Sequence, residues 1–207
     1  VSISTALGLF SVMLLLSFFI VLLLPIASRT LCLLIALLAL PLILLYPSAK
    51  RWLAYPQALL AICWGFAVLI PWAASESSLS GGWPLFCCWS ATLMWTFGFD
   101  TVYAMADRND DKTLGLKSSA LALGGKVKKI VAISYAMASF FIAMGAYFGG
   151  IGLAFWPIWT VAMVGMQNEV LRLNTLEASM SIFGRHFKNQ VWLGGLLLLG
   201  LILGRMA

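Results

Sequence analysis

Residues 30–49 read TLCLLIALLALPLILLYPSA and contain no Asp, Glu, Lys or Arg. An α-helix rises about 1.5 Å per residue, so about 20 apolar residues are enough to cross the hydrocarbon core of a bilayer. We therefore expect this segment to form one transmembrane helix. The absence of charge along a full membrane thickness decides the fold class.

The same pattern recurs along the chain. Residues 1–28, 52–75 and 77–99 are free of charged side chains, and each run is long enough for one span. Residues 130–168 are also uncharged but too long for a single span. A cluster of glycines near their middle favours two helices joined by a turn, and its members are Gly149, Gly150 and Gly152.

Composition agrees with a lipid solvent. Hydrophobic residues make up 62% of the chain and charged residues 10%, with a mean hydropathy of +1.00, whereas soluble domains are about 25% charged. The last span is expected from Asn189 to Gly204. We predict an all-α integral membrane protein, one domain over residues 1–207, with seven transmembrane helices.

The basic residues indicate the orientation of these helices. If consecutive connections alternate sides, eleven Lys and Arg residues share one side, against Arg29 and Arg205 on the other. Lys and Arg favour the cytoplasmic side, so the eleven should face the cytoplasm. The net charge of +6 then reflects topology and attraction to anionic lipid headgroups rather than a nucleic-acid partner. The eleven are Lys50, Arg51, Arg108, Lys112, Lys117, Lys126, Lys128, Lys129, Arg172, Arg185 and Lys188.

The cysteines point to no metal site or disulfide framework. All four fall within the apolar spans, with no His at ligand spacing. We expect them to pack between helices or face lipid; they are Cys32, Cys63, Cys87 and Cys88.

Four of the seven acidic residues follow the fourth span, in FGFDTVYAMADRNDDK, residues 97–112. If the helix continues to Gly115, then Tyr103, Asp107 and Asp111 lie at i, i+4 and i+8 on one face. Carboxylates this close repel one another unless a cation is present. Without His or Cys nearby, they favour Mg²⁺ shared with the phosphate oxygens of a substrate.

A simpler interpretation is that these acids solvate the helix end and pair with Arg108 and Lys112. Asp100 argues against it, because it lies about two turns inside the polar end and an acid within the membrane usually marks a functional site.

A second polar segment, YPSAKRW at residues 46–52, falls on the same side. Lys50 and Arg51, next to Tyr46 and Trp52, could clamp a diphosphate. The alternative is that the two cations and their aromatic neighbours only anchor a span at the lipid headgroups.

Together these segments resemble a known family. Residues 46–57, YPSAKRWLAYPQ, resemble the YPxxKR…PQ segment of the 4-hydroxybenzoate polyprenyltransferases, members of the UbiA family. Residues 99–118, FDTVYAMADRNDDKTLGLKS, resemble the second Asp-rich motif of the same enzymes. The two motifs occur in the family's order, and we take the resemblance to cover the whole chain.

The resemblance implies an intramembrane enzyme that moves a polyprenyl chain from its diphosphate to the ring of 4-hydroxybenzoate, with Mg²⁺ as cofactor. By position, Asp107 and Asp111 would bind Mg²⁺, Lys50 and Tyr46 the diphosphate, and Arg51 the carboxylate of the acceptor. Asp100, Tyr103 and Asp110 belong to the same motif and would line the substrate site. The expected location is the inner membrane of a bacterium, with the site open to the cytoplasm.

The chain departs from the family in one respect. UbiA-type enzymes have nine transmembrane helices and a first Asp-rich motif, of the NDxxDxxxD type, after the second helix. Neither that motif nor two of the helices are found here, so we expect an N-terminally truncated sequence that is inactive by itself, with activity in its full-length parent.

Other interpretations stay open at this point. A transporter, a non-catalytic membrane subunit, or a UbiA-type enzyme with another aromatic acceptor would also fit the spans. The prenyl length, the oligomeric state, and whether the product is a ubiquinone or plastoquinone precursor are not fixed by the sequence. Four further polar residues are expected to face solvent or headgroups: His186, Glu169, Arg172 and Glu177.

Overall fold

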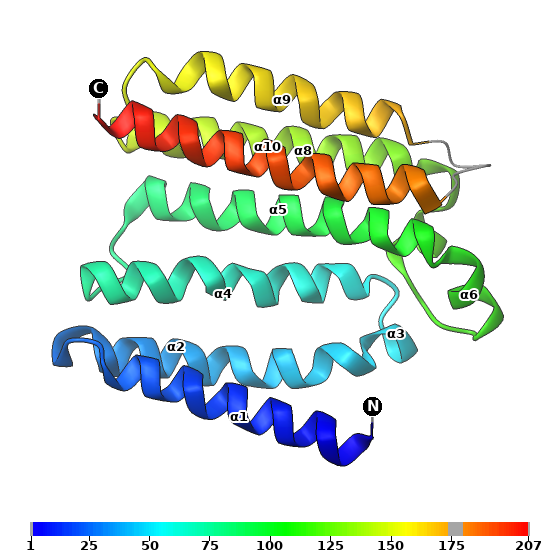
Figure 1. Ribbon diagram of the computed structural model, residues 1–207, viewed down its shortest axis with the longest axis horizontal. Coiled ribbons are helices and arrows are strands. Elements are labelled where there is room, and N and C mark those ends of the chain that lie inside the picture. Colours follow the sequence, from blue (N-terminus) through cyan, green and yellow to red (C-terminus); the bar gives the residue numbers. More distant parts are fainter. Residues whose placement is uncertain (1, 174–179, 207) are drawn as a thin grey trace.

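The computed structural model of the protein describes residues 2–173 and 180–206, and in this part of the chain seven long helices run back and forth as one bundle (Figure 1). Short helices connect them at one end: η1 (Tyr46–Ser48), α3 (Ala49–Trp52), α6 (Arg108–Thr113), α7 (Ser119–Leu123) and η2 (Gly124–Lys126). The long helices are α1 (Ile3–Leu22), α2 (Ile26–Leu45), α4 (Pro56–Glu76), α5 (Gly82–Ala106), α8 (Val127–Phe148), α9 (Phe155–Leu171) and α10 (Met180–Met206).

The all-helical membrane architecture is the predicted one. Among the described residues, five helical stretches are long and apolar enough to cross a membrane. The remaining two predicted spans, α5 and α9, pack alongside these five in the same bundle (Figure 1). The five stretches are Ile3–Leu22, Ile26–Trp52, Pro56–Glu76, Ser119–Phe148 and Ser181–Met206.

Local chemistry sets several helix ends. The hydroxyl of Ser2 accepts a hydrogen bond from the backbone N–H of Thr5 and caps α1. Pro56 begins α4, where a missing N–H costs nothing because that donor would have no helical partner. Gly150 follows α8 with a φ of 65°, a left-handed conformation that glycine adopts without steric penalty. The chain therefore turns back toward α9 where the glycine cluster predicted a turn.

Close packing of α5 on α8 forms the centre of the larger core. A Cβ atom on Gly98 would come within 2.9 Å of the Tyr135 ring, so the missing side chain lets the two helices approach. Helices α9 and α10 complete this core with Met166, Val170 and Leu197, among others. A smaller core between α2 and α4 includes Cys32 and Ala73.

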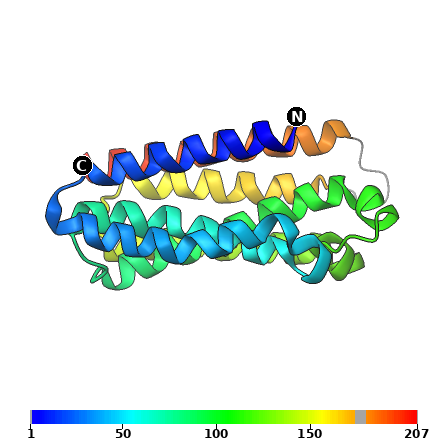
Figure 2. The same cartoon turned by 90° about the horizontal axis from the view of Figure 1, so that it is seen from below.

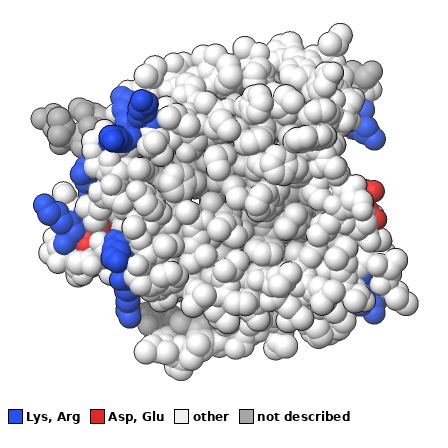
Figure 3. Space-filling model, turned by 180° about the vertical axis from the view of Figure 1, so that it is seen from behind, with Lys and Arg blue, Asp and Glu red and all other residues white. Residues whose placement is uncertain are grey.

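The outer surface separates into an apolar belt and two charged ends. Figure 3 shows a broad face without charged side chains and most Lys and Arg residues gathered at the end that carries α3 and α6. Apolar side chains such as Leu37, Leu38 and Trp192 are exposed on this belt, which is the surface a bilayer covers. That the basic end faces the cytoplasm stays a prediction.

Two features of α10 differ from the sequence prediction. The helix begins at Met180 rather than at Asn189. His186 is therefore inside the helix and only 1% exposed, with its Nε2 2.9 Å from the hydroxyl of Tyr135. The prediction that His186 faces solvent or headgroups was wrong, because the preceding basic residues were taken as the end of the span.

Two other predictions also need correction. Glu169 is buried and bonded to Arg172 at 2.7 Å, although it was expected to be a solvated helix end. Glu177 lies outside the described residues. The fourth long helix ends at Ala106, and Asp107 separates it from α6, so the expected continuous helix to Gly115 is interrupted.

Candidate active site

The two polar segments predicted from the sequence meet at one end of the bundle. The first follows α2 and contains η1 and α3, and the second lies at the junction of α5 and α6. Figure 1 shows α3 and α6 at the same end, although some sixty residues separate them in the chain. The contacts between them place a cation from one segment against the carboxylates of the other.

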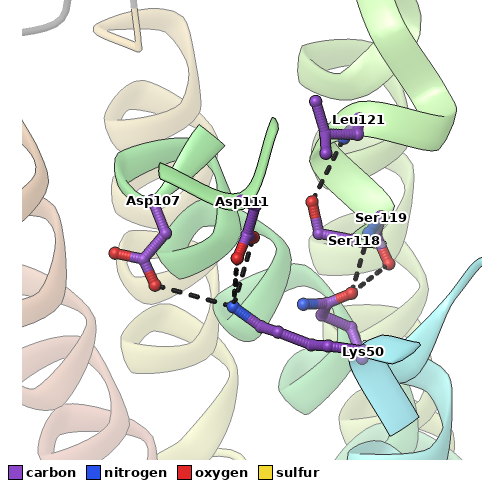
Figure 4. Close-up of polar contacts among 7 residues, drawn as sticks. Lys50, Asp107, Asp111, Ser118, Ser119 and Leu121 are labelled. Atoms are coloured by element: carbon purple, nitrogen blue, oxygen red, sulfur yellow. Dashed lines mark hydrogen bonds and ion pairs between the residues drawn. The ribbon is translucent and has the colours of Figure 1, made fainter. Parts of the chain in front are cut away.

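Lys50 is the centre of this contact. Its Nζ lies 2.9 and 3.1 Å from the two carboxylate oxygens of Asp111 and 3.8 Å from Oδ2 of Asp107 (Figure 4). The Asp111 side chain is only 4% exposed. A carboxylate that is buried in this way needs a cation or several hydrogen-bond donors to offset its lost hydration. Lys50 supplies that charge, from a segment far away in the sequence.

Further hydrogen bonds fix the two segments to each other. The backbone N–H of Lys117 donates to the carbonyl oxygen of Lys50 at 2.7 Å, and its ammonium group donates to the carbonyl of Trp52. The side-chain oxygen of Gln57 accepts from the backbone N–H and the hydroxyl of Ser119, at 2.8 and 2.7 Å (Figure 4). Because Gln57 and Ser119 are both buried, these two bonds hold the start of α4 against α7.

A polar pocket opens next to Lys50. It has a volume of about 260 Å³ and combines two phenols, an ammonium group, an amide and two carboxylates in its lining. Tyr46 and Asp100, from two segments distant in sequence, both line this pocket. The lining residues are Tyr46, Lys50, Gln57, Asp100, Tyr103, Ala104 and Asp107.

A larger apolar cavity adjoins the polar pocket. Its volume is about 590 Å³, and it lies between α4, α5 and α10. Asp100 and Tyr103 line both spaces, so the charged pocket and the apolar cavity meet at these two side chains. The rest of the lining is mostly aromatic and aliphatic: Leu60, Trp64, Thr92, Trp95, Thr96, Phe99, Gln190, Val191 and Gly194.

The carboxylates suit a hard divalent cation that is shared with a ligand. Asp107 and Asp111 both approach the same ammonium nitrogen, so their oxygens converge on one point that a cation can occupy. Among the described residues, no group of three or more His, Cys, Asp or Glu is placed to hold a metal by itself. Mg²⁺ keeps several waters and is often held by one or two carboxylates plus substrate phosphates, which this donor set fits.

Most of the sequence matches a known protein family. Residues 1–192 match the UbiA prenyltransferase family. The chain belongs to this family. A 4-hydroxybenzoate solanesyltransferase from Synechocystis sp. is 40% identical over 152 residues, which cover 72% of this chain and 50% of that protein. A 4-hydroxybenzoate octaprenyltransferase from Polynucleobacter necessarius is 32% identical over 158 residues, which cover 72% of this chain and 50% of that protein.

Solved structures agree with the UbiA-type fold. A UbiA homolog from Aeropyrum pernix K1, in its apo form, matches with a TM-score of 0.73 and 26% identity, over 98% of this chain and 73% of that one. A digeranylgeranylglyceryl phosphate synthase matches with a TM-score of 0.69 over 99% of this chain and 70% of that one, at 16% identity. The second likeness concerns the fold alone. The chain spans about half the length of the curated relatives it matches.

Within this UbiA-type fold, six of the eight site residues predicted from the sequence lie together. Lys50, Asp107 and Asp111 form the charged cluster, and Tyr46, Asp100 and Tyr103 line the adjoining pocket. Arg51 and Asp110 are exposed and do not line either pocket. Their assignment to substrate binding stays a prediction.

The sequence analysis did not single out several residues that line the two pockets or join the two polar segments. Gln57 belongs to the YPSAKRWLAYPQ segment that carries the resemblance, and this position was its only signal. The cavity residues Trp64, Trp95 and Gln190 had no signal. In a chain so rich in aromatic residues, a lining Trp cannot be distinguished from one that faces lipid.

Proposed function

We propose that the protein transfers a polyprenyl chain from polyprenyl diphosphate to the ring of 4-hydroxybenzoate and releases diphosphate. One observation supports this most directly: a charged pocket at Lys50 adjoins a large apolar cavity through Asp100 and Tyr103. A polyprenyl diphosphate has one highly charged end and one long apolar part. The two adjoining spaces match these two parts.

The charged end of the substrate would occupy the polar pocket. Lys50 and the hydroxyl of Tyr46 would contact diphosphate oxygens, and Asp107 and Asp111 would hold Mg²⁺. When bound, Mg²⁺ neutralises the negative charge that builds up on the diphosphate as the allylic C–O bond breaks. Lys50 lies beside the same position, so its ammonium group would stabilise the leaving group as well.

The apolar cavity would hold the first part of the prenyl chain next to the aromatic acceptor. Trp64, Trp95 and Phe99 line it, and their ring faces can stabilise a cation-like allyl group. The same side chains exclude water, which would otherwise capture that group before the ring reacts. Arg51 would contact the acceptor's carboxylate from the rim of the site.

The acceptor is assigned from the relatives rather than from the pocket. Both relatives quoted above are 4-hydroxybenzoate polyprenyltransferases. A site with charged and apolar halves would serve a UbiA-type enzyme with another aromatic acceptor equally well. Acceptor choice is therefore part of the test. The product of transfer to 4-hydroxybenzoate suits a ubiquinone or a plastoquinone pathway.

The test uses a chimera, because the chain spans about half the length of its curated relatives. This chain replaces the aligned half of the Synechocystis solanesyltransferase, and membranes are assayed with a prenyl diphosphate, Mg²⁺ and a panel of aromatic acceptors. We expect 4-hydroxybenzoate to be prenylated and other acceptors to react more slowly. A chimera that is inserted in the membrane but prenylates no aromatic acid would contradict the proposal. Preference for another acceptor would replace 4-hydroxybenzoate in it.

A further inference from the structure

Gln190 of α10 is a buried polar side chain without a partner. It is 1% exposed. Neither its amide nitrogen nor its amide oxygen makes a hydrogen bond within the described part of the chain. An amide that is removed from water without a compensating bond destabilises the fold by about 1–3 kcal/mol. Native proteins rarely keep such a group unless a ligand or water completes it.

The position of Gln190 indicates where that partner would be. Gln190 lines the apolar cavity of about 590 Å³ that also reaches Asp100 and Tyr103. Every residue in that lining except Thr92, Thr96, Asp100, Tyr103 and Gln190 is apolar or a Trp. Gln190 is thus an uncharged hydrogen-bonding group on the α10 wall of a space that is otherwise suited to hydrocarbon and aromatic rings.

Neighbouring contacts hold this part of α10 against α5. One turn before Gln190, the ring of Phe187 stacks on Tyr103 at 4.8 Å and packs against Phe99 at 5.1 Å between centroids. One turn after it, Gly194 allows such close approach that a Cβ there would lie 3.1 Å from the Trp95 ring. Because packing fixes both flanks, the backbone at Gln190 has little freedom to carry the amide to another partner.

Another polar residue on the same face of α10 does have a partner. His186 lies four residues before Gln190, and its Nε2 is 2.9 Å from the hydroxyl of Tyr135. The interior next to Gln190 therefore pairs one nitrogen of His186, although its Nδ1 has no partner in the described part of the chain. Among the described residues, buried polar atoms without a partner belong to Trp72, Thr101, His186 and Gln190, and of these four side chains Gln190 lines the cavity.

We propose that the amide of Gln190 binds the ring hydroxyl of the aromatic acceptor and makes this residue a determinant of acceptor specificity. The proposal rests on the function proposed above. A phenolic hydroxyl both donates and accepts hydrogen bonds, as the amide does, whereas a prenyl chain does neither. The diphosphate has the cationic pocket at Lys50, so the hydroxyl is the substrate group left for a neutral amide inside the cavity.

This contact would also strengthen as the ring reacts. Attack through the carbon next to the hydroxyl places positive charge on the ring and its oxygen, so the O–H becomes a stronger donor. The amide oxygen of Gln190 accepts that hydrogen bond more strongly than in the ground state. Gln190 then selects acceptors that carry a hydroxyl at this place.

The experiment compares 4-hydroxybenzoate with benzoate, which lacks only the hydroxyl. Binding of each to the chimera in lipid nanodiscs is measured by calorimetry, for the unaltered protein and for Gln190→Leu. We expect Gln190→Leu to weaken 4-hydroxybenzoate about tenfold and to leave benzoate unchanged, as for the loss of one hydrogen bond. The melting temperature should stay the same or rise, because the variant removes an unpaired buried amide.

Gln167→Leu is the matched control. Gln167 is on α9, and its amide donates to the carbonyl of Ala132 at 3.1 Å. This variant should lower the melting temperature and leave the ratio of the two affinities unchanged. If the ratio of the affinities for 4-hydroxybenzoate and benzoate is the same in Gln190→Leu and in the unaltered protein, the proposed role of Gln190 is wrong. The proposed function is not affected by that result. If the unaltered chimera binds 4-hydroxybenzoate no better than benzoate and prenylates neither, both proposals fail.

Discussion

Two of the polar pairs in the bundle, Lys50 with Asp111 and Tyr135 with His186, differ in charge and in surroundings. Lys50 and Asp111 are oppositely charged, and Lys50 lines the polar pocket. A second carboxylate, that of Asp107, lies 3.8 Å from the same ammonium nitrogen. Tyr135 and His186 are both fully buried in the core between α8 and α10, with rings stacked at 5.9 Å. In the view of Figure 2, α10 (red) lies along the upper edge of the bundle and α4 (teal) lies in its lower part.

The Lys50–Asp111 pair is therefore placed to bind a ligand, whereas the Tyr135–His186 pair supports the fold. Lys50 carries one positive charge and faces the carboxylates of Asp107 and Asp111. One negative charge therefore remains, which a further cation can neutralise. Tyr135 and His186 share one hydrogen bond in the core, and neither residue lines the polar pocket or the apolar cavity. We expect substitutions in the first pair to affect turnover and substitutions in the second to affect stability.

The largest effect is expected at the carboxylates. In the chimera, Asp107→Ala and Asp111→Ala should each lower prenyl transfer by on the order of 10²–10³-fold, because the charge on the departing diphosphate loses its stabilisation. Both proteins should still be found in the membrane. Transfer assays with saturating Mg²⁺ and a membrane-fraction immunoblot measure the two quantities. Unchanged rates would remove the charged cluster from the mechanism.

Lys50 should come next. Lys50→Met keeps the length of the side chain but not its charge, so we expect the KM for polyprenyl diphosphate to rise about tenfold or more, as for the loss of a charge-assisted contact. Lys50→Arg retains the charge and should recover part of the loss. Initial rates over a range of diphosphate concentrations test this order. If Lys50→Met behaves like Lys50→Arg, the cation does not contact the diphosphate.

Substitution at Gly98 probes the packing around the second pair. Gly98→Ala places a methyl group within 2.9 Å of the Tyr135 ring, and such overpacking costs about 1–3 kcal/mol of stability. Gly195→Ala is the control, since nothing lies within 4 Å of a Cβ at that position. Thermal unfolding in detergent should show a lower midpoint for Gly98→Ala alone. Equal midpoints would mean that α5 and α8 are not so closely packed.

Tyr135→Phe tests the pair itself. Loss of the hydroxyl removes the partner of His186 Nε2 and should lower the unfolding free energy by about 1–2 kcal/mol. The rate of prenyl transfer should change less than twofold. A large loss of turnover without loss of stability would instead place the Tyr135–His186 pair in the reaction, and the contrast between the two pairs would no longer hold.

The smallest effect is expected at Arg51, which is exposed and outside the pockets. Arg51→Gln should raise the KM for 4-hydroxybenzoate by up to about fivefold, since an exposed ion pair contributes about 1 kcal/mol or less. Benzamide-type acceptors without a carboxylate should show no difference between the two proteins. A difference that is equal for both acceptors would show that Arg51 does not contact the carboxylate.

Much of the fold could be predicted because charge is so unevenly distributed. Runs such as residues 52–75 have few alternatives to a membrane helix, and α4 covers nearly the same range. The start of α10 was missed because Arg185 and Lys188 look like the end of a span. Both cations are exposed at the basic end of the bundle while His186, between them, faces the core. A helix presents alternate faces to core and solvent, which a count of charges does not register.

The sequence by itself determined the solvent of this protein, the approximate course of its long helices and two polar segments with the motifs of the UbiA family. These follow from local properties, namely charge, apolar length and residue spacing. Only the tertiary structure decided that Lys50 meets Asp111, that Arg51 and Asp110 lie outside the pocket, and that Gln190 lines the cavity without a partner. Those relations depend on how helices distant in sequence pack against one another and on which face each helix turns to its neighbour. The pattern of charged and apolar residues along the sequence does not specify that packing.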